Sequence, residues 1–220
     1  MTDISAVYKI LKKEFEQHHT PVVDLIQAQT KDPFKVLVAT ILSARTKDST
    51  TAEAVGRLFV AVSTPKDLLS ISTEKLENLI YPVGFYKNKA RFLKQLPIAL
   101  QNLFGGRIPH TVEELIKLPG VGRKTANLVV AVGFNKHAIC VDVHVHRITN
   151  RLGYINTRIP LETEMRLREK LPRKYWISFN SYLVSFGQNT CTPINPHCDI
   201  CPIYEHCARV DVKTRYARSA

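Results

Sequence analysis

The segment from Leu118 to Ala126 places two glycines directly before two cations, an arrangement suited to binding phosphate. A turn of this kind exposes successive backbone N–H groups where the next helix begins, and these donors point the same way as the positive end of the helix dipole. Glycine also leaves no Cβ in the path of a nucleic-acid backbone. A plain tight turn between two helices is the alternative interpretation. The residues concerned are Gly120, Val121, Gly122, Arg123 and Lys124.

The cations Arg123 and Lys124 fall in the first turn of the following helix, where the helix dipole disfavours positive charge by about 0.3–1 kcal/mol each. Two functions would justify that cost: both side chains contact phosphate, or one of them is an activated lysine nucleophile. A nucleophilic lysine needs a charge partner, and Asp142 stands in an apolar run between Val141 and Val143. A carboxylate there is costly unless it is paired or used. The alternative is that Asp142 only caps the helix that follows it.

Four of the five cysteines follow the spacing C-x6-C-x2-C-x5-C, which indicates a metal site. In a chain without secretory features, clustered cysteines predict metal binding before disulfides. Four thiolates suit a tetrahedral zinc ion or an iron–sulfur cluster equally well by ligand type, so the residues alone leave both open. The fifth, Cys140, is predicted to be a small buried apolar residue. The four candidate ligands are Cys191, Cys198, Cys201 and Cys207.

The composition is that of a folded globular protein with an excess of positive charge. Of the 220 residues, 45% are hydrophobic and 23% are charged, which excludes disordered and fibrous proteins. The formal net charge of +12 favours a polyanionic partner, most often nucleic acid, and a basic protein without that role is the alternative. No apolar stretch approaches the roughly 18 residues of a transmembrane helix, and the N-terminus lacks the apolar region of a signal peptide. We therefore expect no membrane association and an intracellular location.

Apolar side chains recur at helical spacing through most of the chain, so we predict an all-α fold. The Gly105-Gly106 pair indicates a helix end, and the β-branched patch from Ile139 to Val145 fits a loop that enters a helix. Helix starts are indicated by three pairs, which are Asp32 with Pro33, Thr64 with Pro65, and Thr111 with Glu114 as a capping box. Two of the apolar stripes comprise Phe34, Leu37, Val38, Ile41 and Leu42, and Trp176, Phe179, Leu183 and Phe186.

Three segments together resemble the signature of a known enzyme family. They are Leu118 to Asn127, Val141-Asp-Val-His144 and Arg147-x-x-Asn-Arg151, and they are similar to the helix-hairpin-helix and Gly/Pro-Asp motifs of the endonuclease III family of DNA glycosylases. The resemblance extends from about residue 32 to residue 207. It implies that Lys124 attacks C1' of a damaged nucleotide and that Asp142 assists. The cysteine spacing is similar to that of the family's cluster loop, which implies a [4Fe-4S] cluster in residues 191–207.

The resemblance also implies a two-lobed architecture and residues that open the DNA duplex. A helical barrel with the hairpin would span residues 25–136, and residues 1–24 with 137–220 would form the second lobe. Arg45 and Phe85 match positions that fill the gap left by an extruded nucleotide. The alternatives are a solvated helix end for Arg45 and core packing for Phe85. Arg45 departs from the glutamine that many relatives carry, which puts the preference for the opposite base in doubt. His144 and Arg147 are further candidates for DNA contacts, and packing is the alternative for His144.

The activity implied is excision of oxidised pyrimidines from double-stranded DNA, followed by strand cleavage at the abasic site. Only a primary amine such as Lys124 both displaces the base and forms the Schiff base that permits β-elimination, so a bifunctional glycosylase and lyase is expected. The alternatives are a mismatch-directed or uracil-type glycosylase of the same fold, and a non-catalytic DNA-binding module with a zinc-stabilised tail. We expect a monomer of the compact prokaryotic type, located in the cytoplasm at the nucleoid. The motifs do not fix the lesion spectrum.

Overall fold

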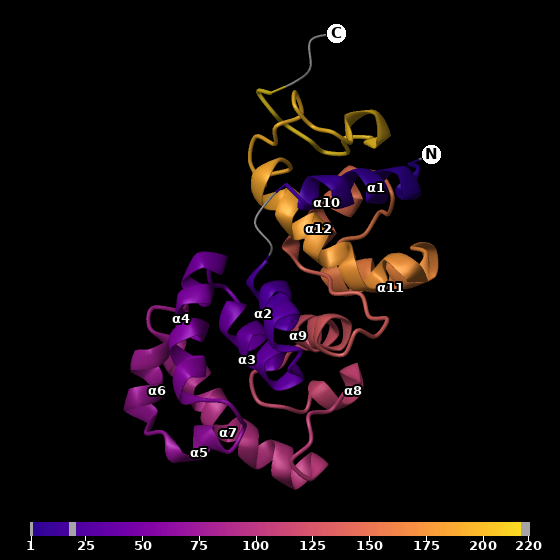
Figure 1. Cartoon of the computed structure of the whole chain (residues 1–220). Coiled ribbons are helices and arrows are strands. Elements are labelled where there is room, and N and C mark those ends of the chain that lie inside the picture. The colour runs from indigo at the N-terminus through magenta and orange to yellow at the C-terminus, as the bar shows by residue number, and fades with distance from the viewer. Residues whose placement is uncertain (1, 18–20, 217–220) are drawn as a thin grey trace. The chain divides into compact units, whose positions relative to one another are not determined.

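The computed structural model describes residues 2–17 and 21–216, and within these ranges the chain consists of helices and loops with no β-strand (Figure 1). The all-α prediction is confirmed. The chain divides into two compact units. Residues 22–136 form one, called here the central unit, and residues 1–21 with 137–220 form the other, called the terminal unit. No helix in the described ranges is long and apolar enough to cross a membrane.

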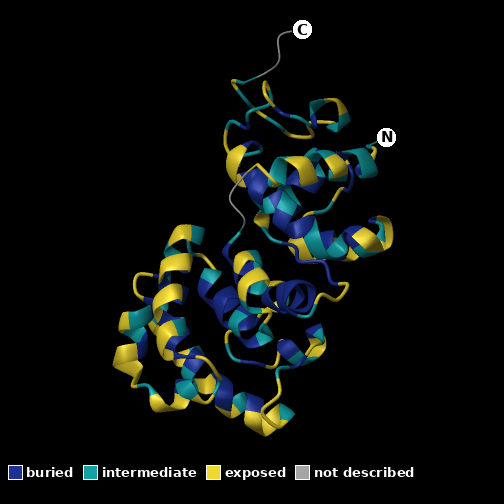
Figure 2. Cartoon of the chain, viewed as in Figure 1, coloured by how far each residue is buried: buried dark blue, intermediate teal, exposed yellow. Residues whose placement is uncertain are grey.

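The central unit is organised around one almost fully buried helix, α3 (Pro33–Ser43), which contacts α2, α4, α7, α9 and η1. Each of its buried leucine and isoleucine side chains contributes about 1.5–3 kcal/mol of transfer free energy. Figure 2 shows α3 largely buried, whereas α4 and α6 expose one face to solvent. The other helices are α2 (Val22–Thr30), α4 (Asp48–Ala61), α5 (Asp67–Ser70), α6 (Thr73–Ile80), α7 (Tyr86–Phe104), α8 (Val112–Leu115), α9 (Arg123–Leu128) and the π-helix η1 (Val129–Gly133).

The terminal unit packs α1 (Ile4–Phe15) and α10 (Val143–Arg151) against α12 (Trp176–Asn189). The predicted stripe on α12 is confirmed, because Phe179, Leu183 and Phe186 are buried in one core cluster with residues of α1 and α10. A loop leads into α10 as predicted for residues 139–145. The remaining elements are α11 (Pro160–Lys170) and the 3-10 helices η2 (Arg173–Tyr175) and η3 (Tyr204–His206).

Most of the predicted helix boundaries are confirmed by hydrogen bonds. Asp32 caps α3 by accepting a hydrogen bond from the backbone N–H of Phe34, with Pro33 at the first helical position. Gly105 ends α7 at a φ of +60°, in the left-handed region that glycine tolerates best. The N–H of Gly106 then bonds to the carbonyl of Leu100, which satisfies one of the last carbonyls of the helix.

One predicted boundary is wrong, and one predicted capping box forms only in part. The helix expected to start at Thr64 begins instead at Asp67, because the Asp67 carboxylate accepts hydrogen bonds from the N–H groups of Ser63 and Thr64 and holds them in a turn. Thr111 caps α8 as predicted by accepting from the N–H of Glu114. The capping box is incomplete, however, because the Glu114 carboxylate bonds to the Thr111 hydroxyl.

Candidate active site, DNA-binding loops and cluster loop

The turn between α8 and α9 is a short hairpin held by backbone hydrogen bonds. The N–H of Leu118 donates to the carbonyl of Leu115 at 3.0 Å, and the N–H of Val121 donates to the carbonyl of Leu118 at 3.2 Å. Gly122 is the N-cap of α9, and its carbonyl accepts the first helical bond from the N–H of Ala126 at 2.9 Å. The predicted order of turn and helix start is therefore confirmed.

The two glycines of the hairpin are required for different reasons. Gly120 has a φ of +75°, and a Cβ there would lie 2.7 Å from a ring carbon of Phe92, so both backbone conformation and packing require glycine. Gly122 is exposed and has an ordinary negative φ, and a Cβ there would meet nothing within 4 Å. The fold therefore does not need a glycine at position 122. The space beside it lies where the first N–H groups of α9 have no acceptor within the helix.

Lys124 lies at the second position of α9 with its side chain exposed. The residues that follow it, Thr125 to Leu128, are buried, so the rest of the helix anchors the exposed lysine. The amide of Asn127 donates to the carbonyl of Arg123 at 3.1 Å and reinforces this first turn. Lys124 thus places a primary amine at a fixed helix end, and a primary amine is a group that can attack an electrophile.

Asp142 is the N-cap of α10, which confirms the capping interpretation. Its Oδ1 accepts hydrogen bonds from the N–H groups of His144 and Val145, both at 2.9 Å. Both bonds fall on one oxygen, so they fix the orientation of the half-buried carboxylate and leave Oδ2 outside the cap. The cap therefore involves only one of the two carboxylate oxygens of Asp142.

Arg147 binds within the terminal unit. Its guanidinium donates to the carbonyls of Gly187 and Cys191, at 3.2 and 2.8 Å, and lies 3.1 Å from Nδ1 of His144. Burial lowers the pKa of Arg147 from its ordinary value. Gly187 provides the space for this arrangement, because a Cβ there would overlap the His144 ring and lie 2.9 Å from the guanidinium. A DNA contact by His144 or Arg147 stays a prediction, and the structure shows both side chains against the end of α12.

Arg45 and Phe85 lie close together in the central unit. The guanidinium of Arg45 is 5.6 Å from the centre of the Phe85 ring, and both residues have left-handed backbones, with φ values of +54° and +57°. Core packing is wrong for Phe85, because its side chain is 60% exposed. Both residues line a pocket of about 220 Å³ whose wall includes Gly120 of the hairpin.

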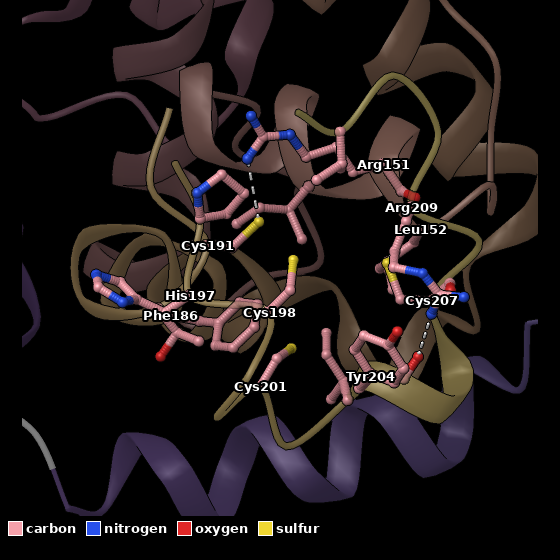
Figure 3. Close-up of a pocket in the computed structure, with 15 residues that line it drawn as sticks. Arg151, Leu152, Phe186, Cys191, His197, Cys198, Cys201, Tyr204, Cys207 and Arg209 are labelled. Carbon is pink, nitrogen blue, oxygen red and sulfur yellow. Dashed lines mark hydrogen bonds between the residues drawn. The ribbon is translucent and has the colours of Figure 1, made fainter. Parts of the chain in front are cut away.

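The four clustered cysteines line a single cavity in the terminal unit (Figure 3). None of them forms a disulfide. Apolar side chains close much of the cavity, among them Ile148, Leu152, Phe186 and Ile203. Within the described ranges, no group of three or more histidine, cysteine or acidic side chains is placed to hold a single metal ion.

Burial favours the protonated form of three of these thiols, Cys198, Cys201 and Cys207. It raises the pKa of Cys201 to about 12 and also raises those of Cys198 and Cys207. Thiolate is the form that binds a metal, so loading the site must release these protons. A cavity lined by four cysteines and several apolar side chains fits a cluster bound through all four sulfurs.

Two arginines at this cavity were not predicted as site residues. Arg151 donates to Sγ of Cys191 at 3.4 Å and to the carbonyls of Thr192 and Pro193 (Figure 3). Arg209 donates to the carbonyls of Tyr204 and Cys207. A signal for Arg151 was present in the sequence: it follows Arg147 by four residues, so both lie on one face of α10. Cys140 lies outside this cavity and is buried, as predicted.

Comparison with known proteins places this chain among DNA repair enzymes. The family model described as HhH-GPD superfamily base excision DNA repair protein matches residues 38–173, and that of the iron–sulfur binding domain of endonuclease III matches residues 191–207. Endonuclease III of Thermotoga maritima is 48% identical over 176 residues, which cover 80% of this chain and 83% of that protein.

Solved structures agree with these matches. A trapped covalent intermediate of endonuclease III with DNA has a TM-score of 0.83 and 35% identity, and the match covers 94% of both chains. A thermostable thymine-DNA glycosylase has a TM-score of 0.81 and 25% identity, over 93% of this chain and 95% of that one. These two proteins share the fold with this chain, and their names show that the fold carries more than one kind of DNA repair enzyme.

Proposed function

The chain belongs to the endonuclease III family of the HhH-GPD superfamily, and we propose that Lys124 is the amine that carries out its reaction. The protein is a DNA glycosylase with abasic-site lyase activity in the base excision repair of oxidised pyrimidines, and it binds a [4Fe-4S] cluster. As further parts of the proposal, its preferred ligand is double-stranded DNA with a damaged pyrimidine or an abasic site. It acts as a monomer and works in the cytoplasm at the nucleoid.

The single observation that carries the proposal for Lys124 is an exposed primary amine at the start of a buried helix, next to the glycine hairpin. Its nitrogen attacks C1' and the base leaves with the electron pair of the glycosidic bond. Transfer of a proton from the nitrogen to the ring oxygen then opens the sugar and gives a protonated Schiff base. This cation acidifies the C2' proton, and its removal expels the 3' phosphate. Water finally releases the amine, so one lysine performs both steps.

Asp142 is proposed as the carboxylate that assists this reaction. Its oriented carboxylate would stabilise the positive charge that develops on the sugar and would accept a proton from the attacking amine. The cap on α10 uses Oδ1 and leaves Oδ2 for that role. The preformed orientation is what an electrostatic contribution to catalysis requires, because no reorganisation is then needed during the reaction.

The hairpin and the pocket beside it are proposed to bind DNA. The amides at Gly120, Val121, Gly122 and Arg123 would hold a backbone phosphate, where the open space at Gly122 permits close approach. Phe85 and Arg45 would fill the gap left by the extruded nucleotide, the ring by stacking and the guanidinium by hydrogen bonds to the unpaired base. Their shared pocket with Gly120 supports a common role.

Cys191, Cys198, Cys201 and Cys207 are proposed as the cluster ligands. When bound, the cluster supplies four iron–thiolate bonds that tie the C-terminal loop together. Arg151 would face the resulting negative charge through its contact with Cys191, while its other hydrogen bonds hold the loop backbone. In this role the cluster stabilises structure and takes no part in the excision steps.

The proposal for Lys124 is tested by separating base removal from strand cleavage. Wild type, Lys124→Ala and Lys117→Ala are incubated with duplexes that carry one thymine glycol, one uracil or one abasic site. Lys117 is an exposed lysine of the same hairpin and serves as the control. We expect wild type and Lys117→Ala to release thymine glycol and cleave both that duplex and the abasic one, and Lys124→Ala to cleave neither. Cleavage by Lys124→Ala at the wild-type rate would overturn the proposal for Lys124. Preferential release of uracil by wild type would overturn the assignment of oxidised pyrimidines as the substrate.

A further inference from the structure

Lys89 is a buried lysine that connects α7 to the loop after α3. Its side chain is only 5% exposed. The ammonium donates to the carbonyls of Leu42 and Ala44, at 2.8 and 2.6 Å, and to the hydroxyl of Thr46 at 3.1 Å. Two of these acceptors belong to the residues on either side of Arg45, and the third lies three residues before it.

The number of acceptors matches the charged form of the side chain. A lysine ammonium has three N–H donors and no acceptor, and each donor has a partner here. A neutral amine would have two donors, so one buried oxygen would lose its hydrogen bond. Burial lowers the pKa of Lys89 to about 8, which still leaves the ammonium as the major form at neutral pH. The ammonium of Lys89 is thus a buried charge, which is costly unless it is hydrogen-bonded, and its three hydrogen bonds all go to residues 42–46.

Lys89 lies in the first turn of α7, where its backbone N–H makes the ordinary helical bond to the carbonyl of Phe85 at 3.1 Å. Its side chain reaches the loop that carries Phe85 through Thr46, whose hydroxyl receives the ammonium and also accepts from the N–H of Gly84 at 3.1 Å. The two loops approach so closely that a Cβ on Gly84 would lie 2.5 Å from the carbonyl oxygen of Arg45. The ammonium of Lys89 therefore supports the Arg45 loop directly and the Phe85 loop through Thr46.

Both supported residues have a backbone conformation that needs such support. Arg45 and Phe85 have positive φ values, which side chains other than glycine and asparagine seldom adopt. Residues in such conformations persist only where the surrounding structure holds them, and they are frequent at functional sites. The strain is located at the two side chains proposed to enter DNA.

We propose that Lys89 is a positioning residue for duplex opening, whose ammonium holds the Arg45 and Phe85 loops together so that both side chains meet the DNA in a preformed arrangement. The inference rests on the proposed role of Arg45 and Phe85 as gap-filling residues. Lys89 itself contacts no DNA in this account, because its ammonium is directed at protein oxygens.

Lys94 provides a matched control on the same helix. Its ammonium also has three acceptors, the carbonyls of Leu68, Leu69 and Ile71 at 2.9, 3.0 and 2.7 Å. These acceptors lie in α5 and at its C-terminal end, in a segment that carries neither Arg45 nor Phe85. Replacing Lys94 with methionine removes an equivalent structural support without disturbing the two DNA-opening residues.

The test compares duplex opening with the chemistry of the amine. Lys89→Met and Lys94→Met, as full-length cluster-loaded proteins, are examined for single-turnover excision of thymine glycol and for the fluorescence of a 2-aminopurine beside the lesion. Borohydride trapping on a single-stranded abasic oligonucleotide reports the amine without duplex opening. We expect Lys89→Met to lose about 10- to 100-fold in excision together with the fluorescence rise, and to keep trapping within about twofold. Lys94→Met should stay within about twofold of wild type in all three measurements.

Double mutants test whether Lys89 acts through the two residues it supports. Adding Arg45→Ala or Phe85→Ala to Lys89→Met should cost much less than the same change in wild type, because residues that act together are not additive. Thr46→Val removes the hydroxyl that accepts a hydrogen bond from the Lys89 ammonium, so it should show a milder form of the Lys89→Met defect. This variant replaces Lys89→Met in the test if Lys89→Met does not fold. A parallel loss of excision and trapping, full additivity, or an equal defect in Lys94→Met would overturn the inference. If Arg45→Ala and Phe85→Ala have no effect in wild type, their proposed role fails first.

Discussion

Replacing the two hairpin glycines one at a time with alanine should have opposite effects on stability and on DNA binding. Gly120 is held by its positive φ and by contact with Phe92, whereas Gly122 has an ordinary φ and open space around it. If the open space at Gly122 receives the DNA backbone, a methyl group there is harmless to the fold and harmful to the complex.

The structure gives the size of both effects. For Gly120→Ala, a left-handed backbone costs about 1–2 kcal/mol and overpacking against Phe92 about 1–3 kcal/mol more. The melting temperature should fall by roughly 4–20 °C, at about 2–4 °C per kcal/mol for a chain of this size. Gly122→Ala should instead stabilise the protein by about 0.4–1 kcal/mol, because it restricts the unfolded chain. Loss of one charge-assisted bond to phosphate costs about 1.5 kcal/mol or more, which weakens DNA binding over tenfold.

Thermal unfolding and fluorescence anisotropy on a duplex with a non-cleavable abasic-site analogue measure the two quantities, at a fixed salt concentration. The expected result for Gly122→Ala is a melting temperature equal to or above that of wild type, together with a dissociation constant raised more than tenfold. Wild-type affinity in this variant would refute the assignment of the hairpin as the phosphate site. A lowered melting temperature would refute the argument that position 122 is sterically open.

Three further changes test other parts of the account. Asp142→Asn keeps an acceptor for the cap on α10, so it should melt close to wild type and lose roughly 100-fold or more in single-turnover excision; unchanged excision would remove the carboxylate from the mechanism. Cys201→Ser should lose iron and the visible iron–sulfur absorption, whereas Cys140→Ser should retain both; equal iron content in the two proteins would contradict the ligand assignment. Burial lowers the pKa of Lys89 to about 8 from an ordinary value of 10.5. Between pH 8 and pH 10.5 the unfolded chain therefore binds more protons than the folded chain, and the contribution of Lys89 to the free energy of unfolding rises with pH over this range. Urea unfolding at about pH 7.5 and 9.5 should therefore show wild type gaining stability relative to Lys89→Met, and a constant difference would contradict the lowered pKa.

Local signals predicted the helices well wherever the deciding interaction lay within a few residues. Asp32 before Pro33 and the glycine pair at position 105 are decided by one cap and one left-handed residue, and both are confirmed. The helix start predicted at Thr64 is wrong, and again a local interaction decides it. The carboxylate of Asp67 accepts hydrogen bonds from the N–H groups of Ser63 and Thr64. Where two residues a few positions apart can both cap a helix, the sequence pattern alone does not show which of them sets the helix start.

The parts of the candidate site that lie in one short segment could be predicted from the sequence. The parts that depend on contacts between residues far apart in the chain could not. The hairpin, the cap at Asp142 and the four cysteines each occupy short segments with a recognisable pattern. Lys89 has no such pattern, because its acceptors lie 43 to 47 residues earlier in the chain. The contacts of Arg147 are also distant in sequence: its guanidinium binds the carbonyls of residues 187 and 191, which no local pattern indicated, and its DNA contact stays a prediction.

The central claim is that one amine, that of Lys124, forms the covalent intermediate with DNA. Borohydride reduction of the enzyme on a thymine glycol duplex, followed by protease digestion and mass spectrometry of the DNA-linked peptide, tests it directly. We expect a single modified lysine, Lys124, and no adduct with Lys124→Ala. An adduct on another lysine, or trapping that persists in Lys124→Ala, would contradict the account.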